Sequence, residues 1–599
     1  MLATPVRHTK TAAFGVAMML SALASPGLAE DEDAIDTIIV NGDVITLDPL
    51  KPSATAIAIE DGIIVATGDD AEILALGGAD TDVIDVEGRS VIPGLNDSHL
   101  HATRGGRFFN TELRWDGVKS LERGLEMIGE QAARTPEGQW VRVIGGWSPY
   151  QFAERRLPTP AELTEASPDV PVFVLFLYSQ GYLNAAGVKA LGITAETEAP
   201  PGGRYELTED GGAILHAEPN PTILYQTIGA LPSLSEVDQV NSTRHFYREL
   251  NRFGVTSAID AGGGGHTYAK DYVGTRILAE RGELDIRVSN YLFPQKSGEE
   301  LASFEQWNSE VALNANLAEH LTHGFVVEGG GEFLTWSAGD FENFMADRPS
   351  LEERDGYKSQ LTEVTRYLVR NGWPIRIHAT YDQSIGLIMD VFEEVHETER
   401  AAGRPGFHGV RWAVDHAETV SRENLARIRA LGGGVAIQSR MAYAGEFFVD
   451  RYGAEVAASA PPLRDIIEMG IPLGAGTDGT RVGSYNPWPA IEWLMTGKTV
   501  GGLETRGPRH RLTRMEALRL YTVGSAWFSG EESLKGRIAP GQFADLAVLS
   551  VDYLSVPDDA ISDIESVLTV TDGRIVHGSG AFSQFAPTLP ARSPSWSPR

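Results

Sequence analysis

Short apolar runs alternate with stretches of helical periodicity along most of this chain, and this alternation restricts the fold more than any other feature. The runs are typical of buried strands and fall at 140–145, 170–177, 255–260, 286–291, 324–327, 374–378, 410–416, 433–438 and 471–478. Helical patterns lie between them, for example at 361–370 and 422–430, and a capping box begins another helix at Thr513. Repeated β–α units predict a parallel sheet covered by helices, either a (β/α)8 barrel or a doubly wound sheet.

Both ends of this region have a different pattern. Residues 37–43, 56–62 and 63–67 are short β-branched runs with Asn-Gly and Asp-Gly pairs, which are strong hairpin signals, and residues 536–550 and 567–577 are also strand-like. We predict one β-sandwich built from residues 30–92 and 531–578, and a barrel at 93–530 with an insertion around 105–255. Residues 579–599 contain four prolines and several serines and are predicted to form a disordered tail.

Composition limits the compartment and the partners. A basic start, an apolar run at 12–24 and small residues before position 30 predict a signal peptide over 1–29, hence a periplasmic or secreted protein. The apolar run is shorter than the roughly 20 residues that span a bilayer. A net charge of −32 argues against nucleic acid or an anionic membrane as a partner, and makes a strongly anionic substrate less favourable. Without cysteine, a metal must be held by His, Asp, Glu or a modified Lys.

Polar residues stand at the ends of several predicted strands. The stretch VIPGLNDSHLH at 91–101 ends in His99 and His101, which share one face if the segment is a strand and can then hold one divalent metal. His378, His416 and Asp478 end three later runs. Each alone could be a capping or core residue. In a parallel barrel, however, all strand C-termini point to one face, so the five side chains are expected to converge on a common site.

The remaining histidines of the predicted mature chain stand in polar or helical surroundings. They are expected to lie at the surface and are His216, His245, His266, His320, His323, His396, His408, His510 and His577. Pocket residues are expected from the insertion and from 440–452. The aromatic candidates for an apolar lining are Trp115, Trp147, Tyr150, Tyr182, Trp336 and Tyr443. The same aromatic side chains would serve equally well in a core.

The sequence resembles the amidohydrolase superfamily, in the branch called amidohydrolase-3 or YtcJ-like, which is related to N-substituted formamide deformylase. The segments that carry this resemblance occur in the family's order at 91–101, 140–147, 376–379, 414–418, 476–478 and 536–546. The resemblance implies a (β/α)8 TIM-like barrel with a small β-sandwich domain formed from both termini.

The resemblance also implies roles for the polar residues. His99 and His101 would hold the more buried metal, and His378 and His416 would hold a second metal or orient the substrate. Asp478 would bind metal and accept the proton of the attacking water. Many relatives bridge two metals with a carboxylated Lys, but no Lys stands at 324–333. Either Glu332 or Glu328 would supply the missing carboxylate, or both are loop acids. The sequence therefore leaves open whether the site holds one metal ion or two.

The implied activity is hydrolysis of an amide-type C–N bond, outside protein backbones, in a small organic substrate. The water would be activated by one or two divalent ions, with zinc as the leading candidate and Fe, Mn or Co as alternatives. The same site would also suit an ester or lactone hydrolase. The alternative outside the enzymes is a non-catalytic periplasmic binding protein with a degenerate site. A homodimer is compatible with the resemblance, since relatives often form dimers.

Overall fold

The computed structural model describes residues 35–311, 313, 324–340, 344–345 and 350–599. The predicted signal peptide, His320 and His323 lie outside these residues. Within the described part of the chain, no helix has the length and apolar character needed to cross a membrane.

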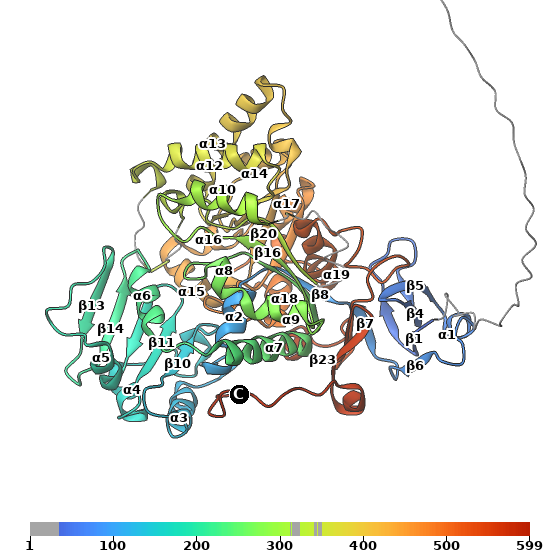
Figure 1. The fold of residues 1–599 in the computed structure, drawn as a ribbon, viewed down its shortest axis with the longest axis horizontal. Coiled ribbons are helices and arrows are strands. Elements are labelled where there is room, and N and C mark those ends of the chain that lie inside the picture. The colour runs from blue at the N-terminus through green and yellow to red at the C-terminus, as the bar shows by residue number, and fades with distance from the viewer. Residues whose placement is uncertain (1–34, 312, 314–323, 341–343, 346–349) are drawn as a thin grey trace, which may run out of the picture.

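Eight parallel strands form a nearly closed barrel at the centre of the molecule (Figure 1), in the order β21-β20-β19-β18-β17-β16-β15-β8. They are β8 (Leu95–Leu100), β15 (Val255–Asp260), β16 (Arg287–Leu292), β17 (Phe325–Gly330), β18 (Ile375–Ala379), β19 (Trp412–His416), β20 (Gly434–Gln438) and β21 (Leu473–Gly476). The edge strands meet just beyond their ends, where the His101 amide donates to the Gly479 carbonyl (3.0 Å) and the Asp478 amide to the His99 carbonyl (2.9 Å). The predicted (β/α)8 barrel is therefore confirmed, and the doubly wound alternative is wrong.

Helices cover the outside of this barrel. They include α7 (Glu236–Arg252), α9 (Val273–Glu280), α10 (Glu300–Glu310), α12 (Tyr357–Arg370), α13 (Asp382–Ala401), α14 (Arg422–Ala430), α15 (Arg440–Tyr452), α18 (Pro487–Thr496) and α19 (Arg514–Arg519). In α12 the buried residues Leu361, Val364 and Leu368 recur at helical spacing, so one face packs on the sheet while the other meets solvent. The predicted capping box at Thr513 begins α19.

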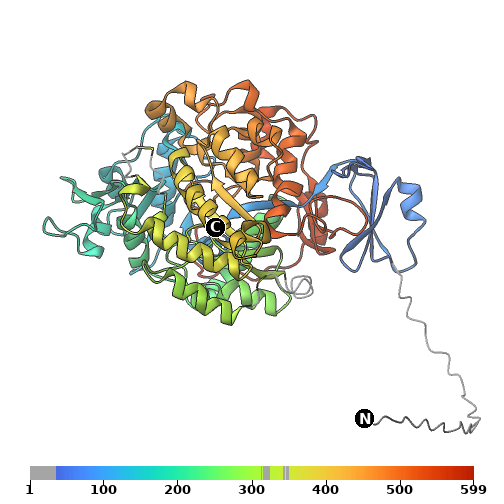
Figure 2. The same cartoon turned by 90° about the horizontal axis from the view of Figure 1, so that it is seen from above.

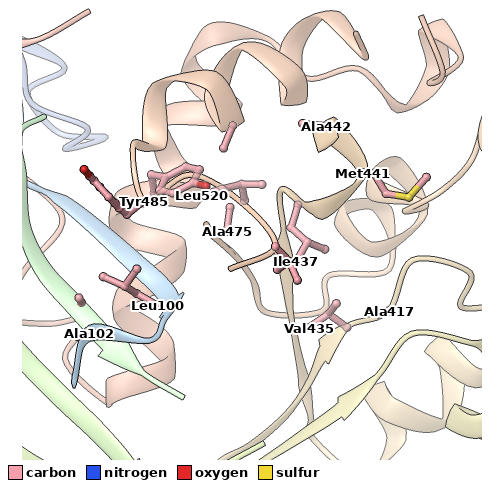
Figure 3. Close-up of a cluster of buried hydrophobic side chains, with 14 of the residues drawn as sticks. Leu100, Ala102, Ala417, Val435, Ile437, Met441, Ala442, Ala475, Tyr485 and Leu520 are labelled. Atoms are coloured by element: carbon pink, nitrogen blue, oxygen red, sulfur yellow. The ribbon is translucent and has the colours of Figure 1, made fainter. Parts of the chain in front are cut away.

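Apolar side chains from neighbouring barrel strands pack together with the surrounding helices. Figure 3 shows Leu100 of β8, Ile437 of β20 and Ala475 of β21 in one buried cluster, with Met441 of α15 beside them. The barrel strands read as near-continuous apolar runs because both faces of a parallel barrel sheet are covered. This packing fixes the strand ends that carry the polar residues.

A small β domain stands beside the barrel and contains strands from both termini, as predicted. One sheet has the order β5-β4-β1-β6, and the other has the order β24-β23-β22-β7-β2-β3. Their bounds are β1 (Thr37–Val40), β2 (Asp43–Ile45), β3 (Ser53–Ala54), β4 (Ala56–Glu60), β5 (Ile63–Gly68), β6 (Asp82–Asp85), β7 (Ser90–Pro93), β22 (Leu546–Leu549), β23 (Ser566–Thr571) and β24 (Arg574–Gly578). Ile57 of the first sheet shares a buried cluster with Val91 and Val548 of the second. Strand β7 leads directly into β8, so the domain anchors the first barrel strand.

The insertion between β8 and β15 folds into a sheet of its own, in the order β13-β14-β12-β11-β10-β9. Its strands are β9 (Glu112–Leu113), β10 (Val141–Ile144), β11 (Val172–Phe176), β12 (Gln180–Leu183), β13 (Gly203–Leu207) and β14 (Ala213–Ala217). Its helices are α3 (Leu121–Ala132), α4 (Pro160–Ala166), α5 (Ala185–Leu191) and α6 (Thr222–Ala230). The apolar runs at 140–145 and 170–177 therefore belong to this sheet and not to the barrel. Figure 2 shows the insertion and the β domain on opposite sides of the barrel.

In place of the expected disordered tail, residues 579–599 lie against the protein and pass beneath α7 (Figure 1). The side-chain amide of Asn241 donates to the Ala591 carbonyl (3.0 Å), and that of Gln131 donates to the Trp596 carbonyl (2.8 Å). A segment rich in Pro and Ser cannot bury a core of its own. Here polar side chains of α7 and α3 bind its carbonyl groups, and composition alone does not reveal such partners.

A buried ion pair joins the barrel to the β domain. Arg287 of β16 donates from Nε to Asp545 Oδ2 (3.0 Å) and from Nη2 to Asp572 Oδ1 (2.7 Å). Both Arg287 and Asp545 are buried. Asp545 also accepts from the Asp572 amide (2.8 Å), so one carboxylate holds the start of β22 against the barrel.

Replacing Arg287 by Met is expected to lower the free energy of unfolding by about 3–5 kcal/mol, because Asp545 stays buried without its counter-charge. Arg123→Met is the matched control, since Arg123 forms solvent-exposed ion pairs with Glu126 and Glu130, and this variant should keep a stability close to that of the wild type. Denaturant titrations followed by circular dichroism measure both effects. Similar losses in the two variants would contradict this account of the interface.

Candidate metal centre

The structure brings together all five strand-end residues of the sequence analysis, namely His99, His101, His378, His416 and Asp478, and all five are buried. Asp478 Oδ1 lies 3.0 Å from His101 Nε2 and 3.8 Å from His99 Nε2. The ring centroids of His378 and His416 are 4.0 Å apart, and those of His99 and His416 are 5.2 Å apart. Side chains from the first and last barrel strands thus meet at the C-terminal mouth, where sites form in barrels of this kind.

Glu332 completes the cluster. Its Oε2 lies 3.1 Å from His378 Nδ1, 3.5 Å from His99 Nε2 and 3.6 Å from His416 Nε2. Its Oε1 lies 3.8 Å from His101 Nε2. The carboxylate therefore stands between the His99–His101 pair and the His378–His416 pair, in the position that a shared acidic ligand would occupy.

A run of glycines carries the chain to this point after β17. A Cβ at Gly329 would lie 2.1 Å from the Pro374 carbonyl oxygen, and one at Gly331 would lie 2.6 Å from the Ala261 carbonyl oxygen. Only glycine allows such a close approach of two backbones. The Gly-Gly-Gly-Glu sequence thus places Glu332 at the centre of the mouth.

Glu328 lies elsewhere. Its charged neighbours are Glu531 and Lys535. Burial and the negative charge of Glu531 raise its pKa to about 8. Of the two acids that the sequence left open, the structure places Glu332 with the histidines and Glu328 apart from them.

The donor atoms fall into three overlapping sets, each within 4.8 Å: His99 with His101 and Glu332, His99 with His416 and Asp478, and Glu332 with His378 and His416. Imidazole and carboxylate are ligands that zinc, iron, manganese and cobalt accept. His99 Nε2 is buried and has no hydrogen-bond partner, an unfavourable state that a bound cation would relieve. The residues therefore fit a divalent metal, and Glu332 belongs to two of the sets.

Neighbouring groups orient the first two imidazoles. His101 Nδ1 donates to the Gly262 carbonyl (2.5 Å), which leaves the Nε2 lone pair directed at the cluster. His99 Nδ1 lies 3.4 Å from Asp415 Oδ2, and Asp415 in turn accepts from Arg376 Nε (3.1 Å). Sequence reasoning assigned no role to Asp415 or Arg376. The signal was present, because both are charged residues inside apolar strands, immediately before His416 and two residues before His378.

A second buried acid aligns the two edge strands. Asp97 accepts from Thr477 Oγ1 (2.6 Å) and from the His99 amide (3.0 Å), and burial raises its pKa to about 6.

His416 and Asp478 adopt φ values of 77° and 54°, in the left-handed region that is unfavourable for non-glycine residues. Strain of this kind persists where surrounding contacts enforce it and is frequent at functional sites.

The charge state of the centre follows from its neighbours. Burial alone would raise the pKa of Asp478, but the hydrogen bond with His101 and the charges of His99 and Arg440 lower it, so the group is a carboxylate. Burial, His378 and Arg440 hold the pKa of His416 well below its usual value, so this imidazole is neutral and able to bind a cation. Arg440 Nη2 donates to Asp478 Oδ2 (3.1 Å) and lies within the 440–452 segment expected at the pocket.

A pocket opens above the cluster. His101, Glu332, His378 and Asp478 line it together with Arg104, Tyr178, Tyr225, Phe293, Phe333 and Trp336. The insertion contributes Tyr178 and Tyr225. Of the six aromatic candidates, Trp336 lines this pocket, whereas Trp115, Trp147, Tyr150, Tyr182 and Tyr443 are not among its lining residues. Three of the histidines expected at the surface, His245, His266 and His510, are instead buried. Arg107 bonds to His266 Nδ1 (2.7 Å).

Comparisons with known proteins match the chain over nearly its whole length. The profile of the Amidohydrolase family matches residues 82–577. N-substituted formamide deformylase of Arthrobacter pascens is 24% identical over 561 residues, covering 90% of this chain and 97% of that protein. Putative amidohydrolase YtcJ of Bacillus subtilis is 25% identical over 547 residues, covering 87% and 96%. An uncharacterized metal-dependent hydrolase from Pyrococcus horikoshii shares the fold, with a TM-score of 0.62, 22% identity and coverage of 87% and 99%.

Glu332→Gln is expected to reduce bound metal per chain to half or less of the wild-type content, because a ligand shared by two donor sets loses its charge. Glu328→Gln makes the same chemical change at a buried acid outside the cluster and should keep wild-type content. Plasma mass spectrometry after loading with zinc and desalting measures both. Equal metal content in the two variants would contradict the assignment of Glu332.

Proposed function

The chain belongs to the amidohydrolase family, and we propose that it is a metal-dependent hydrolase that cleaves an amide-type C–N bond in a small organic molecule. One observation carries the proposal: four histidines, Glu332 and Asp478 meet at the barrel mouth with their donor atoms within 4.8 Å in overlapping sets. The similarity to N-substituted formamide deformylase over nearly its full length supports a C–N bond as the target.

We infer that zinc is the metal and that two ion positions share Glu332. His99 and His101, with Asp478, would hold the first ion, and His378 and His416 would hold the second. A divalent ion held there would lower the pKa of a bound water from about 15.7 toward about 7 and would polarise a carbonyl oxygen. The chain's own contribution is a rigid and buried donor set whose imidazoles are oriented in advance by Gly262 and Asp415.

Asp478 is proposed as the proton acceptor. It stays ionised, and Arg440 holds one of its oxygens while the other faces His101. It would take a proton from the attacking water and return it to the leaving nitrogen as the C–N bond breaks. The products are a carboxylic acid and an amine.

Asp478→Asn keeps the size of the side chain but removes its proton affinity, so kcat should fall by about 10²–10⁴-fold while most of the metal is retained. The assay is amine release from a panel of N-formyl, N-acyl and cyclic amides by the zinc-loaded protein. Asp450→Asn, an exposed acid on α15, serves as the control and should behave like the wild type. Turnover by Asp478→Asn at the wild-type rate would remove the proposed role.

We propose that the protein acts in the periplasm or outside the cell, on the strength of the signal-like pattern at 1–29. Mass spectrometry of the protein recovered from a periplasmic fraction should find a mature N-terminus at Glu30. A chain that retains residues 1–29 and stays in the cytoplasm would contradict export.

A further inference from the structure

The backbone changes from strand to helix at His101. This residue follows β8 and is the N-cap residue of α2 (Ala102–Phe108). An N-cap side chain usually accepts a hydrogen bond from the amide two or three residues further on. The His101 side chain makes no such bond, because its ring faces Asp478 in the cluster. The first turn of α2 therefore needs an acceptor from another part of the chain.

Asp260, the last residue of β15, supplies this acceptor from the neighbouring strand. Its Oδ2 accepts from the amide of Thr103, the second residue of α2 (2.7 Å). Its other oxygen, Oδ1, accepts from the Gly262 amide (2.9 Å). Asp260 is only 1% exposed, and a carboxylate buried to this degree is unfavourable unless its oxygens are hydrogen-bonded. One carboxylate thus joins the start of α2 to the loop after β15.

The loop that Asp260 binds is also the loop that orients His101. The Gly262 carbonyl accepts from His101 Nδ1 (2.5 Å). Gly262 has a φ of 83°, and a Cβ at this position would lie 2.7 Å from Phe293 Cβ, so only glycine fits this path. Asp260 therefore fixes both the backbone that carries the imidazole and the carbonyl group that the imidazole binds.

Gln295 fixes the far end of the same loop. Its Oε1 accepts from the Gly265 amide (2.7 Å), and its Nε2 donates to the Gly263 carbonyl (3.0 Å). The four consecutive glycines at 262–265 are thus bound by Asp260 at one end and by Gln295 at the other. Glycine loses more conformational freedom on folding than any other residue. These side-chain bonds therefore determine where the acceptor of the imidazole lies.

We propose that Asp260 is a positioning residue that fixes the tautomer and the direction of the His101 imidazole toward the bound cation. Groups that orient a ligating imidazole in this way raise the metal affinity of a site. Asp415 lies directly against His99 Nδ1 (3.4 Å), whereas Asp260 acts on His101 through the backbone of Gly262 and Thr103. The inference rests on the proposed metal centre.

Asp260→Asn tests this role because an amide side chain has only one oxygen. Its NH2 group must face the Thr103 amide or the Gly262 amide, so one of the two bonds is lost. The zinc affinity, measured by competition with a chromophoric chelator, should fall by about 10–100-fold. Asp36→Asn is the control, because Asp36 also accepts from a backbone amide, that of Asp61 in the β domain (2.7 Å). This control should bind zinc as tightly as the wild type.

A double-mutant cycle separates a positioning role from a general structural defect. If Asp260 acts through His101, Asp260→Asn should change the zinc affinity by less than about twofold once His101→Ala has removed the imidazole. A structural defect does not depend on the imidazole. An equal loss of affinity in the two backgrounds would therefore overturn the inference.

The metal-free protein provides a readout that does not depend on zinc. Nuclear magnetic resonance of the 15N-histidine-labelled wild type should show a proton on His101 Nδ1, assigned by its absence in His101→Ala. Asp260→Asn should shift or remove this signal and leave it unchanged in Asp36→Asn. An unchanged His101 signal in Asp260→Asn would overturn the inference. A wild type that binds no zinc would instead contradict the proposed metal centre, and the imidazole signal would still test the role of Asp260.

Gln295→Met is a second variant, which acts on the far end of the loop. It keeps the size of a half-buried side chain and removes the bonds to Gly263 and Gly265. The variant should shift the His101 signal and weaken zinc binding, and it serves as the test if Asp260→Asn does not fold. A wild-type signal together with wild-type affinity in Gln295→Met would overturn the proposed action through the loop.

Discussion

The ion pair between Arg376 and Asp415 inside the barrel is the interaction on which the site depends. Their exposed fractions are 1% and 0%. Removing one partner of such a pair is strongly destabilising because the other charge stays buried without a counter-charge. Asp415 is also the group that faces His99 Nδ1, and Arg376 donates from Nη2 to the Ser98 carbonyl (3.0 Å). One pair therefore compensates buried charge and orients the most enclosed imidazole of the cluster.

The contacts that close the barrel also position the residues of the site. Asp97 joins β8 to Thr477 at the end of β21, and the backbone bonds of His99 and His101 to the next loop complete the ring. These contacts hold Asp478 in its left-handed conformation beside His101. A chain with the barrel open at this seam would have neither the donor set nor the cavity above it.

Sequence reasoning predicted the barrel and five of the six clustered residues because both follow from periodicity and from the common direction of parallel strands. It could not choose between Glu328 and Glu332, since both have the same parity along an ideal strand. The register of β16 against β17 shifts so that Val327 pairs with Asn290 and Gly329 with Tyr291. Glu328 therefore has no pairing partner in β16, and the alternation of side chains between the two faces is interrupted there. The path of the tail and the burial of His266 depend on tertiary partners that no local pattern encodes.

We expect the cluster at the barrel mouth to hold a divalent metal. Anomalous diffraction at the zinc edge from crystals of the metal-loaded protein tests it most directly. We expect density within about 2.0–2.2 Å of His99 Nε2, His101 Nε2 and a Glu332 oxygen. A zinc-loaded crystal with anomalous density only at other positions would contradict the account.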